Sequence, residues 1–179
     1  MTLTEVKTLL ERRRIPYQTA QYEDEAAYWR HCMPFPYTDS ARKCKITALV
    51  IPSVNAVKNI EIQFSRLHGE YVFDELWFGG HSFDFCDCDP ELVEADVLDF
   101  IGRIADGKLA VIETNHVTRR RLVSVNCFDL TDSDSVFGAP GFREAVAKIE
   151  APKSLWAKLT GRRLQYDIYD WRTYRQIVK

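Results

Sequence analysis

The stretch that decides the fold is LHGEYVFDELWFGGHSFDFCDCDPELVEADVLDFIG, residues 67–102. It holds ten carboxylates and neither lysine nor arginine. Because the whole chain has a formal charge of -2, the remaining residues together sum to about +8. The stretch also contains a Gly79-Gly80 turn signal, followed by Phe83 and Phe85 alternating with polar residues. We interpret it as a scaffold element that presents negative charge to a positively charged partner.

The last part of this stretch predicts a helix. Asp89 is a favourable N-cap and Pro90 a favoured first helical residue. Apolar side chains then repeat at helical spacing, and Gly107 supplies a stop signal. The apolar face consists of Val93, Val97, Phe100, Ile101 and Ile104.

Strands are predicted on both sides of this helix. Before it, three runs joined by short turns predict an antiparallel meander over 59–65, 71–78 and 81–88. We therefore expect one α+β domain over residues 1–179, with a mostly antiparallel sheet of about six strands and helices packed on one face. The other predicted strands are 46–51, 109–113, 121–128 and 162–169, and the other predicted helices are 2–14, 23–30, 142–149 and 152–159. In the first of these helices, Thr2 and Glu5 match a capping box, and the apolar residues that follow at helical spacing are Leu3, Val6, Leu9 and Leu10.

Composition narrows the class of protein. The chain is 46% hydrophobic and 28% charged, as in ordinary soluble globular proteins. Nearly balanced charge argues against general affinity for nucleic acid. No run of 18 apolar residues predicts a membrane span, and the N-terminus lacks the features of a signal peptide. Five cysteines without a disulfide pattern then predict reduced thiols in the cytoplasm.

Metal and cofactor motifs are incomplete. His81, Cys86 and Cys88 lack the second ligand pair that structural zinc requires. A calcium loop starting at Asp87 would place Leu92 where glycine is needed and Leu98 where glutamate is needed. No phosphate-binding loop or nucleophile motif is present. We expect no metal, no cofactor and no catalytic residue.

Basic residues gather elsewhere, at Arg119–Arg121 and over residues 153–179, where aromatic side chains are interleaved. This combination occurs in proteins that bind single-stranded nucleic acid. We favour the alternative that the aromatic residues belong to the core and the basic residues pair with the acidic stretch, within the fold or in a dimer.

An acidic surface has a known use in capturing a basic protein, because complementary fields accelerate association. Trp77 and Phe78 lie beside Asp74 and Glu75, and aromatic residues next to charge are typical of interface hot spots. The predicted partner-binding residues are Asp74, Glu75, Trp77, Phe78, Asp84, Asp87, Glu91 and Glu94.

The segment ELWFGGHSFDFCDCDPELVEADVLDFIGRIADGKLAVI, residues 75–112, also carries a resemblance. It resembles the strand, acidic helix, Gly-Lys and strand of small α+β immunity proteins from bacterial polymorphic and contact-dependent toxin systems. The resemblance implies a non-enzymatic cytoplasmic antitoxin that binds one cognate toxin domain. The expected partner is a basic protein toxin, for example a nuclease, whose cleft must hold phosphates.

Two alternatives remain open. One is a small enzyme in which His81 or His116 acts as a base near Asp84 or Glu113. The other is a structural or regulatory subunit whose acidic and basic faces pair in a homodimer. The enzyme predicts a pocket around these groups, and the subunit predicts self-association.

Overall fold

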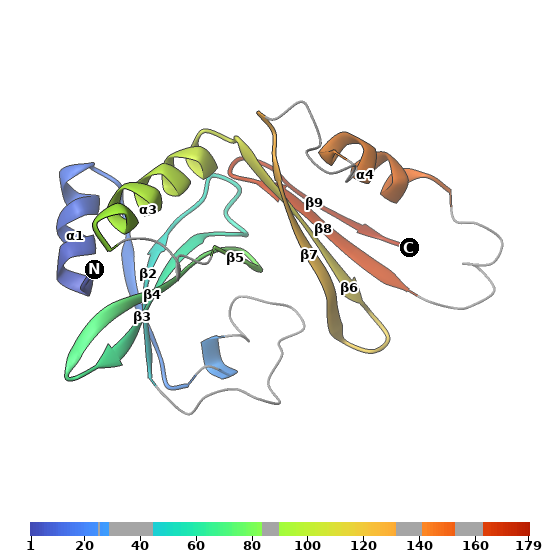
Figure 1. The fold of residues 1–179 in the computed structure, drawn as a ribbon. Coiled ribbons are helices and arrows are strands. Elements are labelled where there is room, and N and C mark those ends of the chain that lie inside the picture. Colours follow the sequence, from blue (N-terminus) through green and yellow to red (C-terminus); the bar gives the residue numbers. More distant parts are fainter. Residues whose placement is uncertain (25, 29–44, 84–89, 132–140, 153–162) are drawn as a thin grey trace.

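The protein was analysed as a computed structural model, which describes residues 1–24, 26–28, 45–83, 90–131, 141–152 and 163–179. For residues 67 and 90–94 the backbone alone is described. The fold is α+β, with one antiparallel sheet of five strands and another of four (Figure 1). The predicted fold class is therefore confirmed at this level.

The five-stranded sheet, sheet A, is a meander in which every strand pairs with the next one along the chain. All six residues of its second strand are buried, so both faces of the sheet are covered at this point. The strands are β1 (Gln18–Tyr22), β2 (Ile46–Ile51), β3 (Ile60–Leu67), β4 (Glu70–Phe78) and β5 (His81–Phe83).

The four-stranded sheet, sheet B, has the order β7-β6-β8-β9. Its central pair is β6 with β8, in which Val111 opposes Tyr169 and Glu113 opposes Asp167. Residues directly opposite each other project from the same face of a sheet. The strands are β6 (Leu109–His116), β7 (Arg121–Asp129), β8 (Leu164–Asp170) and β9 (Tyr174–Val178).

Helices α1 (Leu3–Arg12) and α3 (Pro90–Ala105) lie side by side over one face of sheet A (Figure 1). The capping box predicted for α1 is present, because Thr2 N–H donates to Glu5 Oε2 at 2.7 Å and Glu5 N–H to Thr2 Oγ1 at 3.3 Å. Helix α4 (Phe142–Glu150) packs against sheet B, where the ring centroids of Phe142 and Phe128 are 5.6 Å apart.

One hydrophobic core joins the two sheets. It contains Val6 of α1, Ile101 of α3, Ile60 and Phe78 of sheet A, and Val111 of sheet B, all less than 5% exposed. Both sheets therefore contribute side chains to the same interior. The predicted inward face of α3 is confirmed for Val97, Ile101 and Ile104, which are 0–3% exposed.

The prediction of about six strands in one sheet, with helices on one face, is not confirmed. The structure divides the strands between two sheets, and α4 covers the second of them. Alternation of apolar residues shows which face of a strand is buried, but it carries no information about which strand lies beside it. Edge strands β1 and β9 were not predicted, because QTAQY and YRQIV expose most of their side chains and lack a clear apolar alternation.

Parts of other predicted elements lie outside the described residues. These are most of the helix at 23–30, of which residues 26–28 are helical, the end of the strand at 81–88, and the helix at 152–159. Within the described part of the chain, no helix combines the length and apolar character needed to cross a bilayer.

Candidate functional site

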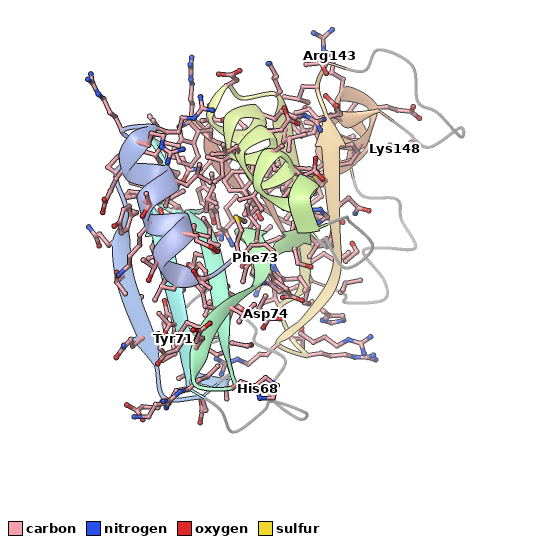
Figure 2. The ribbon with its side chains drawn as sticks, turned by 60° about the vertical axis from the view of Figure 1, so that its left-hand side comes forward. His68, Tyr71, Phe73, Asp74, Arg143 and Lys148 are labelled. Carbon is pink, nitrogen blue, oxygen red and sulfur yellow. The ribbon has the colours of Figure 1, made fainter. Side chains whose placement is uncertain are left out.

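The predicted partner-binding residues of β4 form local hydrogen bonds. The hydroxyl of Ser65 donates to Asp74 Oδ2 at 2.5 Å, and the indole N–H of Trp77 donates to Glu75 Oε2 at 2.8 Å. Asp74 and Glu75 are both half-buried. In Figure 2, His68 marks the tip of the β3–β4 hairpin and Asp74 lies farther along β4, in the direction of α3.

The two predicted aromatic anchors lie in the interior. Trp77 is 8% exposed and packs with Tyr28, with ring centroids 6.4 Å apart. Phe78 is fully buried and makes an edge contact with Tyr169, at 5.3 Å between centroids. The expectation that both border an accessible binding surface is therefore wrong. A buried and an exposed aromatic residue have the same local sequence when acidic residues flank them. Only packing against distant parts of the chain determines which of the two is buried.

The other four predicted residues are described less fully. Asp84 and Asp87 lie outside the described residues. Glu91 and Glu94 belong to the first turns of α3, where the backbone alone is described. The side chains of this acidic helix that the structure places are Asp96, half-buried, and Asp99, exposed.

Three carboxylates of the acid-rich stretch have no partner among the residues that the structure describes. Among the described residues, the side chains of Glu70, Asp96 and Asp99 form no hydrogen bond and no ion pair. The basic side chains that do pair have partners elsewhere in the chain. Arg103 pairs with Asp129, Arg175 with Glu150 at 2.6 Å, and Lys148 with Glu144 at 2.8 Å.

The sequence did not predict a sealed polar cluster between the sheets. Lys58 Nζ lies 2.9 and 3.0 Å from the two carboxylate oxygens of Glu113. The Tyr169 hydroxyl donates to Glu113 Oε1 at 2.5 Å, and the Gly80 N–H donates to the same oxygen at 2.8 Å. Glu113 is 0% exposed and Lys58 6%. Burial, and then the Glu113 charge, raise the pKa of Tyr169 well above its ordinary value.

The Gly79-Gly80 turn allows this cluster to close. Gly79 has a φ of +58°, and a Cβ atom there would lie 2.2 Å from the Tyr169 hydroxyl oxygen. A Cβ atom on Gly80 would lie 2.8 Å from Glu113 Oε1. The glycine pair predicted as a turn therefore also admits sheet B side chains close to the backbone of sheet A.

A second polar cluster follows on the same face of sheet B. The carboxylate of Asp167, 1% exposed, accepts from the Tyr174 hydroxyl at 2.8 Å and from Gln176 Nε2 at 3.0 Å. Gln165 and Asn115 donate to it as well, at 3.0 and 3.2 Å. Burial, followed by the bond to Asp167, raises the pKa of Tyr174. The Asp167 carboxylate is thus satisfied, as in a structural network, whereas Asn115 Oδ1 is buried with no hydrogen-bond partner among the described residues.

One sequence signal pointed towards these clusters. Glu113 occupies the same alternate strand positions as Leu109 and Val111, which face the core. Its position in an apolar run therefore already implied that its charged side chain points inward. Lys58 and Tyr169 carried no comparable signal, because they are 55 and 56 residues from Glu113 in the sequence.

The histidines proposed for the enzyme alternative do not meet Glu113. Burial lowers the pKa of His81, whose ring packs on Phe83 at 4.7 Å between centroids. His116 Nδ1 accepts from the Arg119 N–H at 3.3 Å and so closes a turn. Among the described residues, the Glu113 carboxylate is bonded to Lys58, Gly80 and Tyr169. Among the described residues, no group of three or more His, Cys, Asp or Glu side chains could hold a metal ion.

Comparison with protein-family models, with curated proteins and with solved structures gave no match.

Proposed function

We propose that this protein is a non-enzymatic immunity or antitoxin-type protein that neutralises a basic toxin domain through carboxylates of residues 67–102. One observation carries the proposal. Glu70, Asp96 and Asp99 have no cationic partner among the described residues, whereas Arg103, Lys148 and Arg175 pair with acids outside the stretch. The negative charge of these three side chains is therefore not neutralised by the described residues, and we propose that it is available to another molecule.

The acidic residues stand on well-anchored elements. Val97, Ile101 and Ile104 fix the inner face of α3 in the core, and the carboxylates of Asp96 and Asp99 project from the rest of the same helix. A preformed charged surface loses little conformational entropy on binding and accelerates encounter with an oppositely charged protein. Arg143 and Lys148, which belong to α4, lie apart from the hairpin in the view of Figure 2.

The carboxylates best suited to acid–base chemistry are buried and engaged in hydrogen bonds, which favours a binding function over catalysis. Glu113 and Asp167 are 0% and 1% exposed, and each carboxylate accepts hydrogen bonds from several side chains of the fold. A general base needs to reach the substrate proton, directly or through one water. These two carboxylates are instead engaged in holding strands together.

Identification of the partner is the first test. The tagged protein is used to capture partners from its native lysate at about 50 mM and about 500 mM salt, where screening lengths differ several-fold. We expect one stoichiometric basic protein that dissociates at high salt, and whose toxic activity the captured chain suppresses. Self-association with no second protein would instead support the homodimeric subunit.

Charge reversal then tests the surface itself. Asp96→Lys and Glu70→Lys are expected to lower the association rate about tenfold or more, with little change in thermal stability. Glu144→Lys on α4 is the matched control, since it reverses an exposed charge outside the acidic stretch. Equal association rates for all three variants and the parent protein would contradict the proposal.

A further inference from the structure

A cavity of about 690 Å³ opens between the end of α1, one side of α3 and the end of sheet A. This volume falls in the range typical of small-molecule sites. Most of its lining is apolar and comes from segments far apart in the sequence. The apolar side chains that define it best are Ile15, Ile51, Ile60, Leu98, Ile101 and Trp171.

Three charged residues also line the cavity: Arg13, Arg14 and Asp99. All three are exposed, and among the described residues none of their side chains forms a hydrogen bond or an ion pair. The two guanidinium groups and the carboxylate thus share one cavity without neutralising one another. Their formal charges sum to +1, which matches an occupant with a single negative charge.

The turn after α1 places both arginines at the cavity. Arg14 N–H bonds to Glu11 O at 3.0 Å and Ile15 N–H to Leu10 O at 2.9 Å, which closes the helix end. Arg14 adopts a φ of 57°, in the left-handed region that usually takes glycine or asparagine at this position. An arginine here is unfavourable for the backbone, but it adds a second cation to the cavity.

Helix α3 leaves the space open at Gly102. Glycine is a poor residue inside a helix, yet Gly102 lies within α3 and also lines the cavity. A Cβ atom at this position would meet no other heavy atom within 4 Å. A Cβ atom is therefore accommodated without displacing its neighbours, and we expect a longer side chain to occupy part of the cavity.

We propose that this cavity binds a small amphipathic monoanion, namely a carboxylate on an apolar body. The apolar body lies against Leu98, Ile101 and Trp171, and the carboxylate accepts hydrogen bonds from Arg13 and Arg14. This site shares Asp99 with the proposed toxin-binding surface, but binding of a small anion goes beyond that function. A free fatty acid and the apolar C-terminus of a short peptide share this chemistry.

Calorimetry tests the ligand class with probes kept below their micelle concentrations. Decanoate is expected to bind saturably at a 1:1 ratio with a Kd below about 1 mM. Decanol and decyltrimethylammonium are expected to bind at least tenfold more weakly. The peptide Leu-Leu-Leu, free or amidated at its C-terminus, distinguishes a peptide end from a fatty acid. Absence of saturable decanoate binding, or equal affinity for decanol, would overturn the proposal.

Variants locate the binding. Arg13→Gln with Arg14→Gln is expected to weaken decanoate binding about tenfold or more, whereas Asp99→Asn strengthens it a few-fold because the cavity becomes more positive. Gly102→Leu is expected to abolish binding and to preserve the fold, which circular dichroism checks. Unchanged decanoate affinity in Gly102→Leu would refute the site. A homodimer that Gly102→Leu disrupts would assign the cavity to a second copy of the chain instead.

Discussion

At the scale of single residues, Glu113 is the group with the greatest consequence for folding. It is 0% exposed, and its carboxylate accepts hydrogen bonds from the Lys58 ammonium, the Tyr169 hydroxyl and the Gly80 N–H. One donor from sheet B and two from loops between strands of sheet A converge on this carboxylate, so the desolvation cost of its charge is offset by hydrogen bonds as well as by the ion pair.

Glu113→Gln is expected to lower the free energy of unfolding by about 3–5 kcal/mol, because it leaves the buried Lys58 charge without a counter-ion. Urea unfolding measures the effect. The control is Glu144→Gln, which breaks an exposed pair with Lys148 and should cost no more than about 0.5 kcal/mol. Equal effects for the two variants would show that the buried pair contributes little. The double variant Glu113→Leu with Lys58→Met should regain much of the loss.

At the scale of elements, α1 and α3 formed where the sequence predicted them. Thr2 and Glu5 make the expected capping box, and the apolar spacing of α3 places Val97, Ile101 and Ile104 in the core. Capping and helical periodicity act over a few residues, so they can be predicted locally. The ends and edges of the sheets could not be predicted in this way, since edge strands such as β1 have no strict alternation of apolar and polar residues.

The capping box of α1 should make stability depend on pH in a defined direction. A hydrogen bond from the Thr2 backbone, followed by one from its hydroxyl, lowers the pKa of Glu5. The folded state therefore binds this proton more weakly than the unfolded state, whose carboxyl pKa is about 4.3. The stabilisation is fully present above that value and is lost as pH falls through the lower folded pKa.

The measurement compares the parent protein with Glu5→Gln, which replaces the carboxylate with an uncharged amide of the same size that does not titrate. The difference in their free energies of unfolding is expected to shrink as pH falls from about 5 to about 3. A difference that stays constant or grows over this range would show that the carboxylate of Glu5 has no such role.

At the scale of the whole molecule, two sheets share one interior. Ile60 and Phe78 of sheet A pack in the same cluster as Val111 and Tyr169 of sheet B. Asn55 also links the loop after β2 to the turn after β8, since its Nδ2 donates to Asp170 O at 2.6 Å. Apolar packing and hydrogen bonds both cross the junction, so the main core belongs to both sheets, although sheet A also packs a smaller cluster of Tyr28, Ile46 and Trp77.

We therefore predict that residues 1–179 unfold in one cooperative transition. Far-ultraviolet circular dichroism reports both sheets, and near-ultraviolet circular dichroism reports the aromatic residues at their junction. The two signals should give coincident urea curves. Separate transitions would mean that the sheets are independent domains and would refute the single-domain prediction.

The sequence by itself determined the α+β class, the inward faces of α1 and α3, and the acidic character of residues 67–102. These properties follow from local periodicity, capping and composition. Only the tertiary structure decided that the strands divide between two sheets, that Trp77 and Phe78 are buried, and that Lys58 meets Glu113. The physical reason is that strand pairing and burial depend on contacts between residues distant in the chain, and such contacts leave no pattern in the local sequence around either partner.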